Sequence, residues 1–110
     1  MKKVVTSSNQ AFRALADDTR RTILRLLRDG PMTSGEIAHR FTSSWPTISR
    51  HLAVLREAGL VTAERHGQEI RYELDTSVFQ ELIQHLLEWT RPSGASGRLS
   101  KAPRTRPQEV

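Results

Sequence analysis

The chain has 110 residues, a hydrophobic content of 36% and a formal net charge of +5. The length and the hydrophobic content predict one small domain that completes its burial by dimerising. The absence of cysteine excludes disulfides, thiolate metal sites and thiol redox sensing. No apolar run approaches the roughly 20 residues that span a bilayer, and the first residues lack the apolar segment of a signal peptide, so we expect a soluble cytoplasmic protein without membrane contact.

Two short helices are predicted first. Residues 1–8 are expected to be a flexible lead-in to a domain over residues 9–91. The first helix covers residues 9–16 and has three apolar residues on one side, namely Phe12, Leu15 and Ala16. Asp17 or Asp18 can cap the second helix and place a favourable negative charge at its N-terminus. That helix repeats apolar residues at helical spacing (Ile23, Leu26 and Leu27), and an Asp-Gly-Pro sequence at residues 29–31 ends it.

A second pair of helices follows, with a tight polar turn between them. Thr33 and Glu36 have the spacing of a capping box at the start of a short helix. Ser44 is a good N-cap for the next helix, and Pro46 is tolerated because first-turn amides have no helical partner. The inward residues are Ile37, Ala38 and Phe41 in the short helix, and Ile48, Leu52 and Leu55 in the longer one, which we expect to run to residue 58.

After Gly59 the hydrophobic period changes from 3.6 to 2, which predicts a β-hairpin. Its strands cover residues 61–65 and 70–74, and its tip is the sequence His-Gly-Gln-Glu at residues 66–69. Asp75 or Thr76 then caps a last helix. The apolar face of that helix is wider than one small domain needs, and it consists of Val78, Phe79, Leu82, Ile83, Leu86, Leu87 and Trp89. This order of elements predicts a mainly α winged helix-turn-helix fold with five helices and a two-stranded wing.

The positive charge is concentrated at the end of the chain. Residues 92–110 carry four basic and one acidic residue, a net charge of +3, whereas residues 1–91 carry 13 basic and 11 acidic residues, a net charge of +2. The composition from Pro92 onward, rich in Pro, Gly, Ser and Arg, predicts a disordered basic tail over residues 92–110. That tail could add sequence-independent DNA affinity, although a purely solvated extension is the simpler interpretation.

The helix after the turn has an outward face suited to DNA. In a projection at 100° per residue, Thr47, Ser49 and Arg50 point away from the inward stripe, and His51 lies near its edge. Arginine can donate two hydrogen bonds to guanine, and hydroxyls can bind base edges or phosphate. An ordinary solvated polar face is the alternative. The adjacent hairpin, with basic residues near its tip, favours the DNA-binding interpretation.

Two long runs of the sequence resemble the ArsR-type bacterial repressors. They are FRALADDTRRTILRLLRDGPMTSGEIAHRF (residues 12–41) and SSWPTISRHLAVLREAGLVTAERHGQEIRYEL (residues 43–74). Within that family, the segments DTRRTIL, GPMTSGEIA and TSVFQELIQHLLEW are similar to the SdpR-type autorepressors. The resemblance implies a homodimeric winged-helix repressor that binds an inverted-repeat operator in double-stranded DNA, regulates its own promoter and is found at the nucleoid when bound.

The resemblance also implies roles for particular residues. Those expected to bind DNA in the major groove are Pro46, Thr47, Ser49, Arg50 and His51, and those expected in the wing are Arg65, His66, Gln68 and Arg71. The first and last helices would form the dimer interface through Phe12, Leu15, Val78, Phe79, Leu82, Ile83, Leu86 and Trp89.

The sequence departs from the metal-sensing members of that family. The segment SGEIAHRF, before the turn, has none of the cysteines with which many of them bind metal, and on the last helix only His85 and Glu88 approach a ligand pair. We therefore expect no metal and no cofactor. The chain also has no glycine-rich phosphate loop, nucleophile motif or paired carboxylates, so we expect no enzymatic activity.

Other questions stay open at the level of sequence. Trp45, just before the Pro-Thr pair, either packs over the turn against Phe41 or contacts the DNA backbone or a thymine methyl. Arg20 is expected to have a structural role, whereas Arg21 fits either an ion pair or a phosphate contact. A protein–protein interaction module and a repressor released by a small molecule or a partner protein are the alternative functions.

Overall fold

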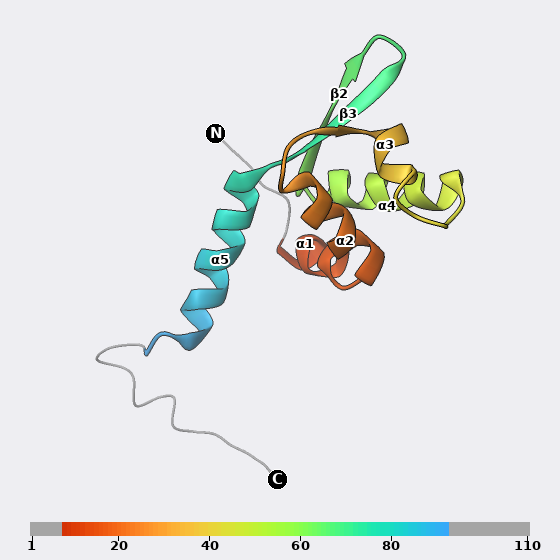
Figure 1. Ribbon diagram of the computed structural model, residues 1–110. Coiled ribbons are helices and arrows are strands. Elements are labelled where there is room, and N and C mark those ends of the chain that lie inside the picture. The colour runs from red at the N-terminus through yellow and green to blue at the C-terminus, as the bar shows by residue number, and fades with distance from the viewer. Residues whose placement is uncertain (1–7, 93–110) are drawn as a thin grey trace. The chain divides into compact units, whose positions relative to one another are not determined.

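The computed structural model describes residues 8–92 (Figure 1). The predicted lead-in up to residue 7 and the predicted basic tail from residue 93 lie outside the described residues. The chain divides after Gln80 into two compact units, which are described separately below. Within residues 8–92, none of the helices has the length and apolar character needed to cross a membrane.

Five helices occur in the described part of the chain: α1 (Ser8–Leu15), α2 (Asp18–Leu27), α3 (Ser34–Ala38), α4 (Trp45–Glu57) and α5 (Thr76–Thr90). The predicted caps are confirmed where the chain offers short polar side chains. Asp17 is the N-cap of α2, and Ser44 is the N-cap of α4. The capping box of α3 is complete, since the Thr33 amide donates to Glu36 Oε1 at 2.9 Å and the Glu36 amide donates to Thr33 Oγ1 at 3.1 Å.

The wing is the predicted hairpin with one additional strand. Strands β2 (Val61–His66) and β3 (Glu69–Leu74) are antiparallel, and Gly67 has the positive φ of 65° that their tight turn requires. A short strand, β1 (Met32–Thr33), pairs with the other edge of β3, which gives the order β1-β3-β2. Sequence analysis missed β1. The added strand ties the start of the helix-turn-helix to the base of the wing.

The core lies between α2, α3, α4 and the base of the wing. Its fully buried large residues are Ile23, Ile37, Ile48, Leu52, Leu55 and Leu60. In α2, Leu24 is buried with Ile23 and Leu27, whereas the predicted Leu26 is half-buried. In α1 the buried side chains are Ala11 and Ala14, while Phe12 and Leu15 are half-buried and Ala16 is exposed. Small side chains therefore bring α1 against α2 and α4, and its larger apolar residues are only partly covered.

Helix α5 carries a broad apolar surface. Asp75 begins it, because its carboxylate accepts hydrogen bonds from the amide and the hydroxyl of Ser77. Leu82 is buried, but the other large apolar residues of its second half are exposed in the single chain, with 53% for Ile83, 42% for Leu86, 45% for Leu87 and 66% for Trp89. A surface this apolar is unusual on a monomer and typical of an interface.

Candidate nucleic-acid interface

Helix α4 presents the polar face that its sequence predicts. Its inner side chains, Ile48, Leu52 and Leu55, are buried, and Pro46, Ser49 and Arg50 are exposed. Pro46 occupies the first turn, where its missing N–H costs no helical hydrogen bond. The positive end of the helix dipole and the exposed Arg50 guanidinium give this end of α4 a positive character suited to phosphate and base edges.

The Thr47 hydroxyl is held within the helix start. Thr47 Oγ1 lies 3.0 Å from Ser44 Oγ, and the Thr47 amide donates to the same Ser44 oxygen at 3.4 Å. Thr47 is half-buried, whereas Ser49 is exposed. Of the two predicted hydroxyl contacts, Ser49 is therefore the one on the solvent-facing side of the helix.

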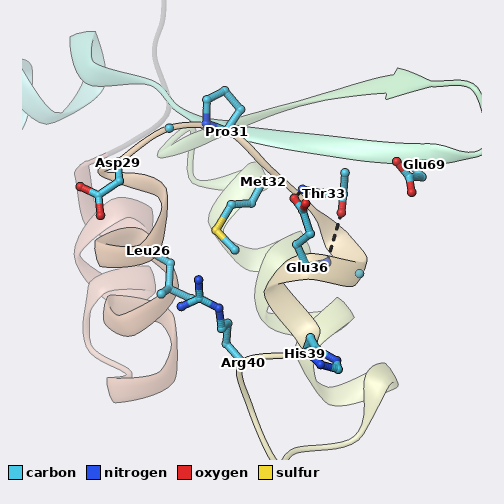
Figure 2. Close-up of a pocket in the computed structure, with 11 residues that line it drawn as sticks. Leu26, Asp29, Pro31, Met32, Thr33, Glu36, His39, Arg40 and Glu69 are labelled. Atoms are coloured by element: carbon cyan, nitrogen blue, oxygen red, sulfur yellow. Dashed lines mark hydrogen bonds between the residues drawn. The ribbon is translucent and has the colours of Figure 1, made fainter.

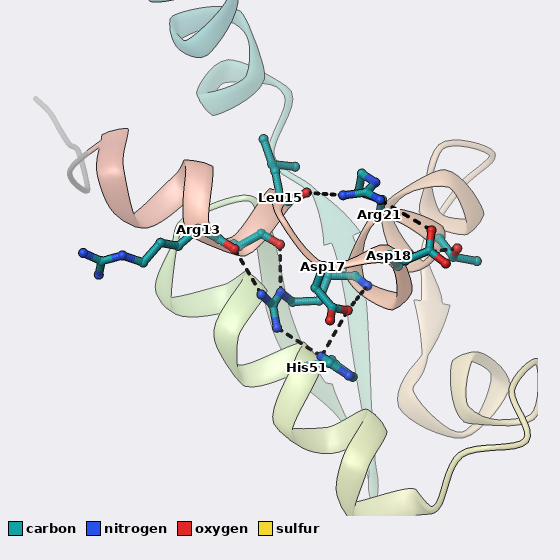
Figure 3. A network of polar contacts seen from close by, with 9 residues as sticks. Arg13, Leu15, Asp17, Asp18, Arg21 and His51 are labelled. Carbon is teal, nitrogen blue, oxygen red and sulfur yellow. Dashed lines mark hydrogen bonds and ion pairs between the residues drawn. The ribbon is translucent and has the colours of Figure 1, made fainter.

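His51 has a different environment from the outward one that the sequence predicts. Its side chain is only 18% exposed, and its Nδ1 lies 3.2 Å from an Arg20 guanidinium nitrogen and 3.8 Å from Asp17 Oδ2 (Figure 3). Because arginine can only donate, Nδ1 of His51 is the acceptor in the shorter contact. The structure thus places His51 between α4 and the start of α2, at the edge of the outward face.

Arg20 is the centre of this polar network. It donates from Nε to the Ala14 carbonyl at 2.8 Å and from a terminal nitrogen to the Arg13 carbonyl at 3.0 Å, so it satisfies the exposed end of α1 (Figure 3). The same guanidinium contacts His51. This agrees with the structural role predicted for Arg20, although it acts on carbonyl groups rather than through an ion pair.

Asp17 and Arg21 complete the connection between α1 and α2. The amide of Arg20 donates to Asp17 Oδ2 at 3.1 Å, and this hydrogen bond lowers the pKa of the Asp17 carboxyl below its ordinary value of 3.8, with smaller contributions from His51 and Arg20. Arg21 donates to the Leu15 carbonyl at 2.8 Å and lies 3.6 Å from Asp18. Arg21 is therefore engaged within the domain, which favours the ion-pair interpretation.

The strand register of the wing places the basic residues that are predicted to bind DNA on two different faces of the hairpin. Directly opposed residues of an antiparallel pair share one face, and Arg65 is opposite Ile70, whereas Arg71 is opposite Glu64 and His66 is opposite Glu69. Arg65 thus belongs to the face whose base, Val61 and Tyr72, is buried against the body. Arg71 and His66 belong to the other face.

The two faces of the wing differ in charge. The face with Arg71 and His66 also carries Glu64, Glu69 and Glu73, and His66 Nε2 lies 3.4 Å from Glu64 Oε1. The carboxylates offset its positive charge. On the other face, the Arg65 guanidinium donates to the Gly67 carbonyl at 3.2 Å. The residues of β2 and β3 that share the face of Arg65 include no carboxylate, and Gln68 lies exposed in the turn beside it.

Trp45 stands at the rim of a small cavity between α3, α4 and β3. The side chain is 54% exposed. The cavity has a volume of about 170 Å³, and the other residues that line it are Ser34, Ala38, Ile48, Ser49, Leu52, Ile70 and Tyr72. Tyr72 is buried at 9% exposure, as expected for a packing residue. Packing of Trp45 against Phe41 stays a prediction, because Phe41 is half-buried but is not part of this cavity wall.

A wider hollow of about 700 Å³ lies between the end of α2, β1 and α3 (Figure 2). Its lining mixes the carboxylates of Asp29, Glu36 and Glu69 with the basic side chain of Arg40. The Glu36 carboxylate is already used in the capping box of α3. The lining of this hollow therefore carries more carboxylates than arginine side chains, which does not favour binding of a nucleic-acid backbone.

A buried three-helix core, an exposed polar helix after a tight turn and a twisted hairpin beside it define a DNA-binding winged helix-turn-helix domain. Residues 17–63 match the family model described as "Bacterial regulatory protein, arsR family". The chain belongs to the ArsR family and is a transcriptional regulator of that class.

Individual relatives agree with this assignment. The chain is 46% identical over 81 residues to the transcriptional repressor SdpR of Bacillus subtilis, which covers 74% of this chain and 90% of SdpR. It is 41% identical over 86 residues to the HTH-type transcriptional regulator Rv2034 of Mycobacterium tuberculosis, with 77% of this chain and 80% of that protein covered. The solved structure of an ArsR-like transcriptional regulator from Rhodococcus sp. RHA1 superimposes with a TM-score of 0.68 at 29% identity, covering 86% of this chain and 93% of that one.

Proposed function

We propose that this ArsR-family transcriptional repressor binds an inverted-repeat operator as a homodimer in the cytoplasm, represses its own promoter, and does so without a metal. The observation that carries the proposal is the exposed polar start of α4 next to the Arg65 face of the wing. In such a domain α4 enters the major groove and the wing lies along the adjacent backbone or minor groove.

The contacts divide into positioning and readout. Arg50 and Ser49 are the proposed base-reading residues, because both are exposed on the first turns of α4. Pro46, Thr47, Arg65 and Gln68 are proposed to follow the sugar-phosphate backbone, and Arg71 and His66 to add weaker contacts from the acidic face of the wing. His51 is proposed to fix the angle of α4 through Arg20 and Asp17 rather than to read a base itself.

Dimerisation rests on the exposed apolar residues of α5 and the half-buried residues of α1. Ile83, Leu86 and Trp89 are exposed in one chain, and covering them removes a large apolar area from water. Phe12, Leu15, Val78 and Phe79, which are partly exposed, are proposed to belong to the same interface, whereas Leu82 is already buried within the single chain. Two symmetry-related α4 helices would then meet half-sites about one helical turn apart, which is why we propose an inverted repeat.

Metal independence is proposed from the side chains available. The chain has no cysteine, and in residues 8–92 no three potential metal ligands of the His, Asp and Glu types come together. The ring of His85, half of the predicted His85/Glu88 pair, stacks edge-on against Trp89 with 5.5 Å between ring centroids. That contact gives His85 a packing role within α5.

The test is DNA binding to the region upstream of the gene. Purified protein should shift this fragment at modest salt at concentrations at least about 1,000-fold lower than those needed for random DNA of equal length. Footprinting should reveal two protected half-sites about one helical turn apart, with and without added chelator. Equal affinity for the upstream and random fragments would contradict the proposal and favour a protein–protein interaction module instead.

A further inference from the structure

The small cavity between α3, α4 and β3 joins the two parts of the proposed DNA interface. Its floor is apolar and buried, since Ile48 is 1% and Leu52 2% exposed. Its rim contains Trp45 and Ser49 from α4, and Ile70 from the wing. Any occupant would therefore touch the helix proposed to read DNA and the wing proposed to hold the backbone.

The size and lining of the cavity indicate what it can hold. A dry apolar cavity of about 150 Å³ in another protein is known to bind benzene, and the volume here is about 170 Å³. Three residues that carry a hydroxyl belong to the lining, namely Ser34, Ser49 and Tyr72. In the described part of the chain, none of the three makes a hydrogen bond to a protein group. A ligand with a single aromatic ring and one polar substituent fits this lining. The ring matches the aliphatic and aromatic walls, and the substituent can form a hydrogen bond with one of the hydroxyls.

We propose that this cavity is the binding site of a small phenol-like aromatic ligand that lowers operator affinity. The effect on DNA rests on the proposed function, whereas binding itself does not. A ring bound in this cavity contacts Trp45 and Ser49 and holds both side chains in positions set by the ligand rather than by DNA. Because binding linkage is reciprocal, the ligand must reduce operator affinity by the same factor by which the operator reduces ligand affinity.

Binding can be measured without DNA, with p-cresol as the probe. The full chain has two indole N–H signals in a proton–nitrogen NMR spectrum, from Trp45 and Trp89, and Trp89→Phe assigns them. p-Cresol should shift the Trp45 signal in a saturable manner and leave the Trp89 signal in place. Absence of a saturable shift up to the solubility limit would overturn the proposal.

Two variants locate the site. Ala38→Leu adds volume on the α3 wall of the cavity, at a residue that is not itself a proposed DNA contact, and should reduce p-cresol affinity about tenfold or more. Ala16→Leu is the control, since it adds the same side chain at an exposed position outside the cavity. Tyr72→Phe removes one hydroxyl and should weaken p-cresol more than toluene. Unchanged p-cresol affinity in both Ala38→Leu and Tyr72→Phe would place the ligand elsewhere and overturn the assignment.

The regulatory part is tested with operator DNA. Saturating p-cresol should lower the operator affinity of the unmodified protein several-fold and leave that of Ala38→Leu unchanged. Binding of p-cresol without any change in operator affinity would overturn the regulatory role. If the protein fails to select its upstream DNA at all, the proposed function is lost, but the NMR result still decides whether the cavity binds the ring.

Discussion

Arg50 is the residue whose chemistry is best matched to base recognition. It is exposed in the second turn of α4, and none of the ion pairs in the described part of the chain involves it. An exposed guanidinium without an ion pair to the protein can donate two parallel hydrogen bonds to guanine in the major groove. Its energetic contribution should therefore depend on the DNA sequence.

Arg50→Ala should cost about 1–3 kcal/mol on the operator and much less on random DNA, because it removes base contacts rather than charge alone. Competition binding with single-base operator variants is the measurement. Arg56→Ala is the matched control, since it removes the same exposed charge from the last turn of the same helix. An equal loss on operator and random DNA for Arg50→Ala would show that Arg50 binds only phosphate.

Trp45 is more than half exposed, so its side chain should contribute less to the stability of the fold than a buried tryptophan would. Trp45→Gln should reduce the unfolding free energy by no more than about 1 kcal/mol but weaken operator binding about tenfold, whereas Trp45→Phe should keep most of the affinity. Denaturant unfolding and DNA titration measure the two effects. A large loss of stability with unchanged affinity would support the packing interpretation of Trp45.

At the scale of elements, the start of α2 is linked to α4 through a charged cap. Asp17 caps α2, contacts His51 of α4 and has a pKa below 3.8. A lowered folded-state pKa means that the charged carboxylate stabilises the fold fully above pH 3.8, and that this stabilisation disappears as the pH falls through the folded-state value. The pH dependence of one variant can isolate this contribution.

Asp17→Asn keeps a good N-cap but removes the charge, so it should destabilise the protein by about 0.5 kcal/mol at neutral pH. The effect is small because the Asp17 side chain is 38% exposed and screened by water. The difference from the unmodified protein should shrink below pH 3.8. Urea unfolding between pH 7 and pH 3 checks this, and a difference that grows on acidification would contradict the charged-cap model.

The wing provides an internal comparison between two arginines. Arg65→Ala should weaken operator binding more than Arg71→Ala. Arg65 lies on the face of the wing that packs on the body, whereas Arg71 lies on the other face, opposite Glu64, whose carboxylate offsets its charge. Each variant removes one charge. The number of counterions released on binding, measured as the slope of log affinity against log salt concentration, should fall by about one for Arg65→Ala and by less for Arg71→Ala. Equal losses would mean that both faces of the wing contact DNA.

Local patterns in the sequence predicted most of the elements, whereas contacts between distant elements were not predictable. The caps Ser44 and Thr33 follow from the local hydrogen-bonding capacity of short side chains. Strand β1 has only two residues, and its pairing depends on the position of β3. A helical projection uses only the spacing of residues along one helix. It therefore places His51 at the edge of the outward face of α4 but cannot show the contacts with Asp17 and Arg20, which lie at the start of α2. The cavity beside Trp45 likewise has walls from α3, α4 and β3.

At the scale of the whole molecule, association should depend on the apolar surface of α5. Four large apolar side chains in its second half are exposed in a single chain, and burial of the remaining exposed area of each is worth on the order of 1 kcal/mol. Two copies that cover the same surface form a closed, symmetric pair. Dimerisation and operator binding are then coupled, because only a dimer contacts both half-sites at once.

Leu86→Lys should convert the protein to a monomer, because a buried lysine without a partner is incompatible with an apolar interface. Gln84→Lys adds the same charge at an exposed position of α5 and serves as the control. Sedimentation should give the monomer mass for Leu86→Lys and the dimer mass for Gln84→Lys, while circular dichroism verifies that both retain helix. The monomer should bind a full operator no more tightly than an isolated half-site. A dimeric Leu86→Lys protein with full operator affinity would exclude this face of α5 from the interface.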